Sequence, residues 1–322
     1  MPSFHYTDPH IVHLDAIKRA VDVPRLIDEL AEGFVAYSSG RAVVPPVAHL
    51  GFDEPRGDVH IKYGYLQDDD VFVIKVAGGF DGNAALGLPP GDGLMLVFDR
   101  RTGMVKAILL DHGYLTDLRT AAAGAVVARA LAPRAVRRIG IIGTGVQGHL
   151  QLDLLRGVTD CRSAMVYGRD ERRAARYVRD MAELGFDVTI AADADSLAAE
   201  CDLIVTTTTA RAPLFRAESV KAGTHVSAFG ADSPGKQELD PVLMGRADVV
   251  VVDSLSQASH HGDLVHALQA GLVTAGSVRE LGDVIRDPSL GRTADDQVTV
   301  CDLTGVAVQD IVVARHVLTQ IS

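Results

Sequence analysis

The residues of this chain with the clearest chemistry are three glycines spaced for binding a phosphate group. Gly143, Gly145 and Gly148 follow the apolar run at residues 139–142 and precede a segment expected to be helical. The first glycine permits a tight turn, the second lets the backbone approach a pyrophosphate, and the third lets a helix pack closely on the strand. The N-terminus of that helix presents N–H groups to the anion. The pattern predicts a dinucleotide site formed by Gly143, Thr144, Gly145, Val146, Gln147 and Gly148.

Residues after later apolar runs bear on which dinucleotide would bind. Residues 164–170 have the pattern of the second strand of a nucleotide-binding sheet and end in Arg169 and Asp170, where an adenosine ribose is expected. An acid there favours the 2′-hydroxyl of NAD, whereas an arginine favours the 2′-phosphate of NADP. The sequence leaves both cofactors open, with Arg169 favouring compatibility with NADP. The hydroxyls of Thr206 and Thr207 are expected to line the dinucleotide site.

Lys75 is a candidate for acid–base or substrate-orienting chemistry. Residues 71–77 alternate so that Lys75 shares a face with Val71 and Val73, and the other face is also apolar. We therefore expect the ammonium group to be buried, which is costly unless the group is paired or functional. The alternative is a lysine that extends its charged end to solvent from the end of the strand.

Two further charged residues stand where a substrate could bind. Arg119 falls in the alanine- and valine-rich segment at residues 114–131, in which Thr116 is expected to be the N-cap of a helix and Asp117 to lie in its first turn. A buried guanidinium there needs an anion, either a substrate carboxylate or a structural salt-bridge partner. Asp232 follows an apolar run at the expected carboxyl edge of a parallel sheet, where ligands bind. It is either a partner for a substrate nitrogen or a turn-forming residue.

The histidines and cysteines do not predict a metal site. His60 and Lys62 lie two residues apart, hence on one face of a strand, in either a binding site or a solvated surface. His260 and His261 are adjacent and point in different directions, and no third ligand has suitable spacing, so we expect a polar surface turn. The three cysteines lie far apart, which is typical of a reduced chain without a zinc site. We therefore expect no metal.

The elements that must position these residues fall into two groups. A helix expected over residues 23–38 is followed by short extended runs, which predict a mostly antiparallel sheet or a partly closed barrel. After the glycine motif, strands alternate with helices, which predicts a doubly wound parallel sheet. The fold class is therefore α/β, with an N-terminal α+β unit. The expected strands lie at residues 42–44, 59–65, 71–77, 94–99, 105–110, 164–170, 186–190, 203–206, 225–228 and 249–252.

Length and charge limit the classes of partner. The chain has 322 residues, of which 47% are hydrophobic, enough to form one large or two ordinary cores, and its length favours two domains. The formal net charge of −11 disfavours nucleic acid, because such a surface repels phosphates. No apolar run approaches the length that spans a bilayer, and the N-terminus lacks a signal-peptide pattern. We therefore expect a cytoplasmic protein that binds neither nucleic acid nor membranes.

Several motifs together resemble the ornithine cyclodeaminase/mu-crystallin family, and they cover nearly the whole chain in the family's order. They are Asp99-x-x-Thr102-Gly103, residues 115–122 (LTDLRTAA), residues 143–147 (GTGVQ), Gly230-Ala231-Asp232 with Lys236-x-Glu238-Leu239-Asp240, and Asp302-x-Thr304-Gly305-x-Ala307-x-Gln309-Asp310. The resemblance implies a homodimer. It also implies a substrate-binding and dimerisation domain at residues 1–120, a Rossmann dinucleotide-binding domain at 121–305, and a C-terminal helix at 306–322 that returns to the first domain.

The same resemblance implies roles for four residues. Lys75 matches a family lysine that contacts substrate, Arg119 matches an arginine that binds the substrate carboxylate, and Asp232 matches an acid that attends the reacting nitrogen. Asn83 matches an asparagine that closes the loop after the lysine strand. We therefore expect Lys75 and Asp232 to be catalytic, and Arg119 and Asn83 to bind substrate.

One departure from the family pattern bears on the substrate. Many members carry Pro-x-Arg after the first helix, an additional carboxylate ligand, whereas residues 41–49 of this chain are RAVVPPVAH. The expected arginine is absent. Lys62, with Arg41 or His60 as further candidates, would supply replacement positive charge. The substrate is therefore expected to carry its carboxylates in a pattern different from that of ornithine.

The expected activity follows from this resemblance. Family members move a hydride between an α-carbon and a nicotinamide, and the protein orients the reacting atoms. The missing arginine, Lys62 and residues 59–65 (VHIKYGY), which resemble the reductase-like branch, favour an NAD(P)H-dependent reductase of a small acidic α-imino acid, specifically iminosuccinate to aspartate. Two alternatives remain. One is an ornithine cyclodeaminase that recycles its nicotinamide, and the other is a mu-crystallin-like protein that binds NADP(H) and a small ligand without chemistry.

Overall fold

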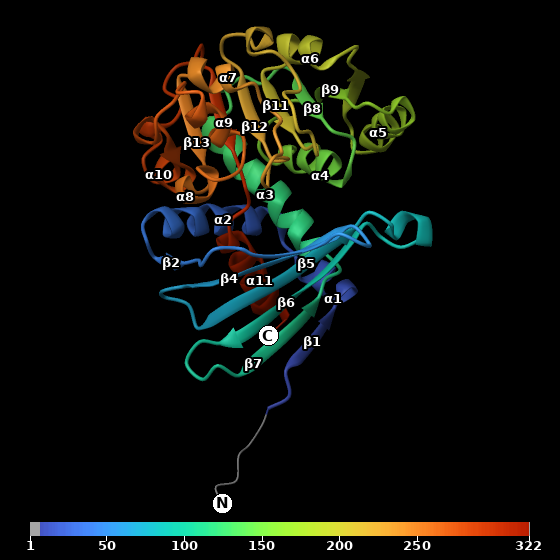
Figure 1. The fold of residues 1–322 in the computed structure, drawn as a ribbon, viewed down its shortest axis with the longest axis vertical. Coiled ribbons are helices and arrows are strands. Elements are labelled where there is room, and N and C mark those ends of the chain that lie inside the picture. The colour runs from blue at the N-terminus through green and yellow to red at the C-terminus, as the bar shows by residue number, and fades with distance from the viewer. Residues whose placement is uncertain (1–6, 322) are drawn as a thin grey trace, which may run out of the picture. The chain divides into compact units, whose positions relative to one another are not determined.

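The chain folds into two compact units (Figure 1). The structure, a computed structural model, describes residues 7–321. Unit 1 runs to Arg119 and resumes at Val306, and unit 2 comprises Thr120–Gly305. The boundary falls within helix α3 (Tyr114–Leu131). Every helix in the described range is too short or too polar to cross a lipid bilayer.

Unit 1 contains a seven-stranded sheet in the order β1-β7-β6-β5-β4-β2, with β3 paired to β4. Every pairing is antiparallel except that of β1 with β7, so the predicted antiparallel sheet is confirmed. The strands β1 and β3 were not predicted, and every residue of β3 is exposed, which removes the alternation that marks a strand. The strands are β1 (His10–His13), β2 (Ala42–Val43), β3 (Ala48–Phe52), β4 (Gly57–Leu66), β5 (Val71–Phe80), β6 (Gly91–Asp99) and β7 (Val105–Leu110).

Helices α2 and α11 pack together over this sheet. The helix α2 (Val23–Ser38) has the predicted bounds and begins where the Asp22 side chain accepts a hydrogen bond from the Arg25 N–H. The helix α11 (Ala307–Ile321) packs against α2, β4 and β5 (Figure 1). Gly33 lets the two helices approach closely, because a Cβ there would lie 2.7 Å from Val312. The remaining short helices of unit 1 are α1 (Leu14–Ala20) and η1 (Asn83–Leu86).

Unit 2 contains an eight-stranded sheet whose pairings are all parallel, which confirms the predicted doubly wound sheet. Its order is β10-β9-β8-β11-β12-β15-β13-β14, so the chain moves outward from β8 in one direction and from β11 in the other. Ligands bind at the carboxyl edge of such sheets where the order reverses. The strands are β8 (Ile139–Ile142), β9 (Ser163–Tyr167), β10 (Asp187–Ile190), β11 (Leu203–Thr206), β12 (His225–Ala228), β13 (Val249–Val252), β14 (Arg279–Glu280) and β15 (Thr299–Asp302).

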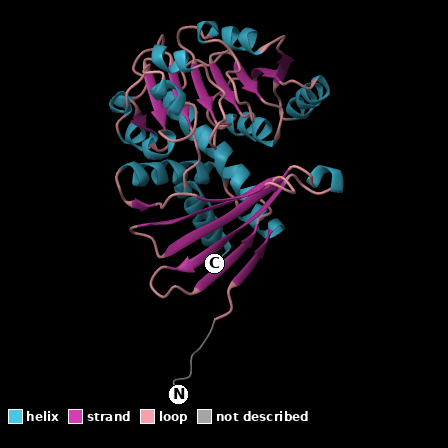
Figure 2. Ribbon diagram, viewed as in Figure 1, coloured by secondary structure: helices cyan, strands magenta, loops and turns pink. Residues whose placement is uncertain are grey.

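Helices cover both faces of the unit 2 sheet (Figure 2). Two successive residues of β8 point to opposite faces of the sheet, and each meets a helix: Gly140 lies against Leu197 of α6, and Ile141 lies against Gly148 of α4. A strand covered on both faces is apolar throughout, as the buried residues of β8 are. The helices are α4 (Val146–Leu155), α5 (Glu171–Glu183), α6 (Ala194–Glu200), α7 (Pro241–Arg246), α8 (Leu255–Ala258), α9 (Leu264–Gln269) and α10 (Leu281–Arg286), with 3₁₀ turns η2 (Ala217–Ser219), η3 (Ala275–Ser277) and η4 (Pro288–Leu290).

The start of α3 differs from the prediction that Thr116 is the N-cap. The helix begins at Tyr114, and the Asp111 carboxylate accepts a hydrogen bond from the Leu115 N–H at 2.9 Å. His112 and Gly113, both with positive φ, turn the chain so that Asp111 faces the first helical turn. Thr116 therefore lies inside the helix.

Candidate functional site

The glycine loop joins β8 to α4 in the predicted way. Gly143 has a φ of 121°, which L side chains rarely adopt, and a Cβ there would lie 2.5 Å from Thr207 Oγ1. A Cβ on Gly148 would lie 2.2 Å from the Gly143 carbonyl oxygen, so the helix packs as closely as the motif requires. A Cβ on Gly145 would meet nothing within 4 Å, and this residue is the N-cap of α4. The space beside Gly145, next to the N–H groups of the first turn, suits a pyrophosphate.

A buried carboxylate, Glu238, joins the ends of β11 and β12 beside this loop. It accepts hydrogen bonds from the Thr206 hydroxyl at 2.7 Å, from the Thr208 N–H at 2.6 Å and hydroxyl at 2.7 Å, and from the Gly230 N–H at 2.7 Å. Burial and the nearby carboxylate of Asp263 raise the pKa of Glu238 to about 7, although its donors act in the opposite direction. One side chain thus fixes both strand ends at the carboxyl edge of the sheet.

Thr206 and Thr207, both predicted to line the dinucleotide site, have different environments. Thr206 is fully buried and donates its hydroxyl to Glu238. It therefore fixes the end of β11 and does not line an open site, which corrects the prediction for this residue. Thr207 lies against Gly143, and its N–H donates to the Ile142 carbonyl at 2.9 Å. The structure thus brings Thr207, but not Thr206, to the glycine loop.

The two residues predicted near the adenosine ribose follow β9. Asp170 is the N-cap of α5, and its Oδ1 accepts hydrogen bonds from the N–H groups of Arg172 at 2.9 Å and Arg173 at 3.1 Å. Arg169 is exposed. Because Asp170 already caps a helix, the guanidinium of Arg169 is the better placed of the two to meet an anionic group.

Asp232 follows β12 at the carboxyl edge of the same sheet, as predicted. Its side chain is 54% exposed, and its Oδ1 lies 2.6 Å from Lys236 Nζ. The Ser233 hydroxyl donates to the same oxygen at 3.3 Å. The geometry is compatible with both interpretations made from the sequence, a partner for a ligand nitrogen and a turn-forming aspartate.

The cations predicted to be buried meet inside unit 1. Lys75 of β5 is 3% exposed and Arg119 of α3 is 4% exposed, so the expected burial of Lys75 is confirmed. Both pair with Asp310 of α11, whose Oδ1 lies 3.4 Å from Lys75 Nζ and 3.1 Å from Arg119 Nε. Arg119 also donates to Gln309 Oε1 at 2.6 Å. The structural salt bridge considered for Arg119 is therefore present.

The charges in this buried cluster shift the pKa values of its members. Burial lowers the pKa of Lys75 to about 7, while the carboxylate of Asp310 acts in the opposite direction. Burial alone would raise the pKa of Asp310, but the charges of Arg119 and Lys75 hold it below its ordinary value. Burial raises the pKa of Asp111 to about 6, with a smaller contribution in the same direction from the charge of Asp310 and one in the opposite direction from Lys75.

Positive charge exceeds negative charge around Asp310. Lys62, directly opposite Lys75 in the β4–β5 register, acts electrostatically on both Lys75 and Asp310. With Arg119, this gives three cationic side chains against the carboxylates of Asp310 and Asp111. Within residues 7–321, Arg119 Nε and both Asp310 oxygens are buried without a hydrogen bond, although the two groups form an ion pair. The excess of cations over carboxylates favours a bound anion, which would supply further acceptors.

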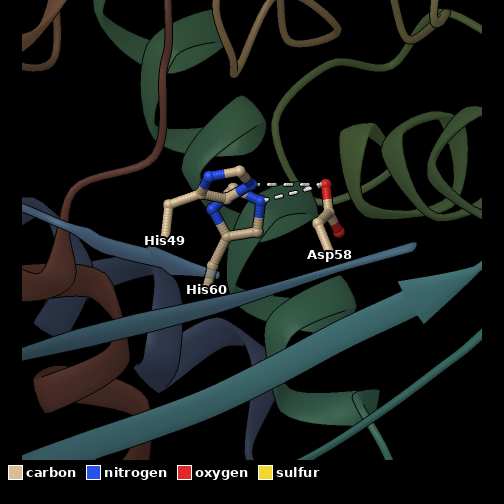
Figure 3. Close-up of side chains that lie close together, drawn as sticks. All are labelled: His49, Asp58 and His60. Carbon is tan, nitrogen blue, oxygen red and sulfur yellow. Dashed lines mark ion pairs between the residues drawn. The ribbon is translucent and has the colours of Figure 1, made fainter. Parts of the chain in front are cut away.

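His60 lies beside Lys62 on the same face of the sheet. His60 is opposite Ala77 and Lys62 is opposite Lys75, and directly opposed residues of an antiparallel pair share a face. His60 Nε2 lies 3.4 Å from Asp58 Oδ2 (Figure 3). Burial lowers the pKa of His60, while Asp58 acts in the opposite direction. The structure thus brings Lys62 and His60 to the face that carries the buried cluster.

Asn83 and Arg41 occupy loop positions in unit 1. Asn83 begins η1, and its Nδ2 donates to the Pro89 carbonyl at 2.8 Å, so it closes the loop after β5 as expected. Arg41 is exposed, and its Nε donates to the Ser39 hydroxyl at 3.2 Å. Arg41 is therefore a weaker candidate than Lys62 for replacing the charge of the missing family arginine.

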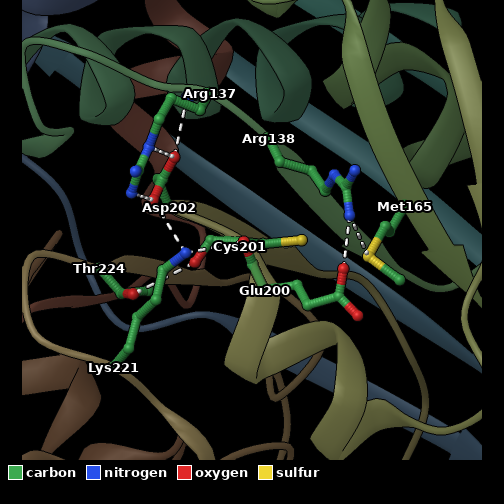
Figure 4. A network of polar contacts seen from close by, with 8 residues as sticks. All are labelled: Arg137, Arg138, Met165, Glu200, Cys201, Asp202, Lys221 and Thr224. Atoms are coloured by element: carbon green, nitrogen blue, oxygen red, sulfur yellow. Dashed lines mark hydrogen bonds and ion pairs between the residues drawn. The ribbon is translucent and has the colours of Figure 1, made fainter.

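The amino edge of the unit 2 sheet carries a polar network of structural character (Figure 4). Asp202 pairs with Arg137 at 2.9 Å and with Lys221 at 3.0 Å. Burial alone would raise the pKa of Asp202, but hydrogen bonds from Arg137 and Lys221 lower it to about 2. Arg138 pairs with Glu200. These residues precede or follow strand ends, so they fix β8 and β11 at the edge opposite the glycine loop.

Sequence reasoning gave no role to Asp310, Gln309 or Glu238, although all three belonged to motifs that it noted. The signal for Asp310 was the need of Lys75 and Arg119 for an anion, which an acid in an apolar helix satisfies. The signal for Glu238 was weaker, because its partners are strand ends distant in sequence.

Comparison with known proteins identifies relatives that match almost the full chain. The model of the ornithine cyclodeaminase/mu-crystallin family matches residues 8–322. An uncharacterized cyclodeaminase of Sinorhizobium fredii is 40% identical over 304 residues, which cover 94% of this chain and 89% of that protein. The structure of an archaeal alanine dehydrogenase dimer with bound NAD has a TM-score of 0.89 and 33% identity, covering 97% of this chain and 95% of its own. The structure of the iminosuccinate reductase of Paracoccus denitrificans in complex with NAD⁺ has a TM-score of 0.89 and 32% identity, and the match covers 97% of this chain and 96% of that chain. The chain therefore belongs to the ornithine cyclodeaminase/mu-crystallin family.

Proposed function

We propose that this protein reduces a small, acidic α-imino acid to the corresponding amino acid, and that its specific reaction converts iminosuccinate to aspartate. The protein is an NAD(P)-dependent oxidoreductase of its family. The observation that carries the substrate proposal is the set of three cationic side chains, Lys62, Lys75 and Arg119, around Asp310, which offers donors to more than one carboxylate. The similarity to the iminosuccinate reductase of Paracoccus denitrificans supports the same choice.

The residues divide the work between binding and orientation. A bound reduced nicotinamide supplies the hydride, and the reaction consumes one proton with each imino acid. Arg119 binds the α-carboxylate of the substrate, and Lys75 adds an ammonium contact that the bound substrate anion keeps protonated. Lys62, with His60 beside it, meets the second carboxylate. Asp232 orients the reacting nitrogen, and Gly143, Gly145 and Gly148 hold the pyrophosphate of NAD or NADP.

The substrate assignment is tested with purified protein, both reduced cofactors and a panel of substrates. The panel contains iminosuccinate, several keto acids with ammonia, and cyclic imines, and the loss of nicotinamide absorbance gives the rate. We expect the highest kcat/KM with iminosuccinate. Conversion of ornithine to proline, with iminosuccinate and NADH left untouched, would show that the proposal is wrong.

Deaminating cyclisation of ornithine is the second candidate, because the relative from Sinorhizobium fredii is described as a cyclodeaminase. Such an enzyme recycles its nicotinamide, so product forms without net change in nicotinamide absorbance. Ammonia release measured beside absorbance separates this reaction from a reduction in one experiment.

We further propose that the protein acts as a cytoplasmic homodimer. The archaeal alanine dehydrogenase relative is described as a dimer. In unit 1, a hollow of about 750 Å³ has apolar and aromatic walls that a second copy would cover. These walls include Val43, Pro45, Tyr63, Tyr65, Phe72 and Ile74. Light scattering after size-exclusion chromatography is expected to give twice the chain mass, and a monomer would contradict the proposal.

A further inference from the structure

Three side chains that coordinate metals elsewhere converge on the β3–β4 hairpin of unit 1. His49 lies directly opposite His60 in the register, and Asp58 lies two residues before His60 on β4. All three therefore project from the same face of the sheet. Figure 3 shows both imidazole rings turned toward the Asp58 carboxylate, with one nitrogen of each ring directed at the same oxygen.

The distances between the donor atoms suit a shared ion. His60 Nε2 lies 3.4 Å and His49 Nε2 lies 4.0 Å from Asp58 Oδ2, and the three ligand atoms all lie within 4.8 Å of one another. Two ligands bound tetrahedrally at about 2.0–2.1 Å from one ion lie about 3.4 Å apart. The His60–Asp58 pair is already at this separation. His49 lies on β3, which within residues 7–321 pairs only with β4, and its side chain is 54% exposed, so it has freedom to close the remaining gap.

The strand neighbours leave space above the donors. Asp58 is opposite Gly51 on β3 and opposite Gly79 on β5, and neither glycine has a side chain to cover the carboxylate. His60 is opposite the small residue Ala77 on β5. The ring centroids of His49 and His60 lie 4.8 Å apart with a 47° tilt, so the two imidazoles do not stack tightly on each other. An ion and one further small ligand therefore have room.

We propose that His49, Asp58 and His60 bind one divalent transition-metal ion of the Zn²⁺ or Co²⁺ class. Two imidazoles and one carboxylate suit this class, whereas Mg²⁺ and Ca²⁺ prefer oxygen ligands alone. Imidazole binds metal in its neutral form, so binding is expected to weaken in acid. Three protein ligands leave one tetrahedral position for water or for a ligand oxygen. The ammonium of Lys62, two residues after His60, opposes the cation and limits its affinity.

The metal site shares His60 with the proposed substrate contact, so it is tested by metal binding alone and not by reductase activity. Full-length protein is treated with a chelator, dialysed and titrated with Co²⁺, and the visible absorption of bound Co²⁺ is followed. Zn²⁺ is then added as a competitor. We expect one ion per chain and a shift of the absorption to that of a four-coordinate ion. His60→Ala and His49→Ala are each expected to weaken binding at least 10- to 100-fold, as loss of even a supporting contact to a metal ligand does.

His112→Ala is the matched control. His112 also faces a carboxylate, with Nδ1 3.0 Å from Asp92, but within residues 7–321 this pair belongs to no group of three ligands. We expect the His112 variant to bind Co²⁺ like the natural protein. Circular dichroism reports whether each variant folds. If His60→Ala does not fold, Co²⁺ binding by His49→Ala decides the outcome, because His49 is exposed and its substitution should not disturb folding.

Two results would overturn the metal site. The first is the absence of saturable Co²⁺ binding by the chelator-treated protein. The second is equal affinity in the natural protein, His49→Ala and Asp58→Asn, because an ion bound in that way lies elsewhere. A loss of affinity confined to the hairpin variants supports the site.

Discussion

The protonation of Lys75 provides a direct test of the proposed substrate site. Burial lowers the pKa of Lys75 from its ordinary 10.5 to about 7, so the free enzyme loses this ammonium charge as the pH rises through neutrality. If the charged form binds the substrate carboxylate, kcat/KM falls about tenfold for each pH unit above that pKa. A bound anion stabilises the ammonium form, so the corresponding fall in kcat occurs at higher pH.

Two substitutions are expected to change the pH at which kcat/KM falls, one by lowering that pH and the other by abolishing the fall near neutrality. Asp310→Asn removes the carboxylate 3.4 Å from Lys75 Nζ. Two unit charges at that separation interact by about 5 kcal/mol at an effective dielectric constant of about 20. Relaxation and water reduce this value, so we expect the fall in kcat/KM to begin at least about one pH unit lower. Lys75→Arg keeps its charge at every pH assayed, so the fall near neutrality should disappear even if the absolute rate drops.

The assay is the initial rate of NADH oxidation with the best substrate of the panel, measured across neutral pH. Lys106→Arg is the control, because Lys106 Nζ lies 3.6 Å from Asp99 but its side chain is 46% exposed. Its pH profile should match that of the natural protein. An unchanged fall near neutrality in Lys75→Arg would refute the assignment of that fall to Lys75.

Four further outcomes test other parts of the structure. Glu238→Gln is expected to lower the free energy of unfolding by about 2–4 kcal/mol, because an amide cannot accept all four hydrogen bonds. In the natural protein, the raised pKa of Glu238 contributes stability that is fully present below pH 4.5 and is lost as the pH rises through about 7. Glu238→Gln should remove this pH dependence of the free energy of unfolding, which denaturation at several pH values measures. Asp202→Asn should cost on the order of 1–2 kcal/mol at neutral pH, and the lowered pKa means that the natural protein keeps this contribution above 3.8 and loses it as the pH falls through about 2. Gly148→Ala should lower the melting temperature and weaken NADH binding at least tenfold by fluorescence titration, whereas Gly145→Ala should spare the melting temperature. Arg169→Ala should weaken binding of NADPH more than that of NADH, and equal losses would contradict its proposed contact.

The spacing of residues along the sequence predicted the elements that depend only on neighbouring residues. Alternation in β5 placed Lys75 on a buried face, and three glycines placed the strand, turn and helix of the dinucleotide motif. The prediction of Thr116 as N-cap was wrong because the positive φ of His112, a conformation that is uncommon outside glycine, turned Asp111 toward the helix.

Contacts between distant segments were beyond the same reasoning. The hydrogen bond from Arg119 to Gln309 joins positions 190 apart, and periodicity does not report which helix covers which strand. The pairing of His49 with His60 depends on the register of β3, a strand with no buried residue to set a pattern. Both contacts required a structure.

Unit 1 is assembled from two chain segments that are separated by the whole of unit 2. Synthesis from the N-terminus therefore produces Lys75 and Arg119 long before Asp310, the carboxylate that lies between them. Until α11 emerges from the ribosome, Lys75 of the first sheet and Arg119 of α3 have no acid from this helix to balance their charges. Unit 2, which is one continuous segment, is free to fold first. The order of folding is thus expected to be the reverse of the order of translation.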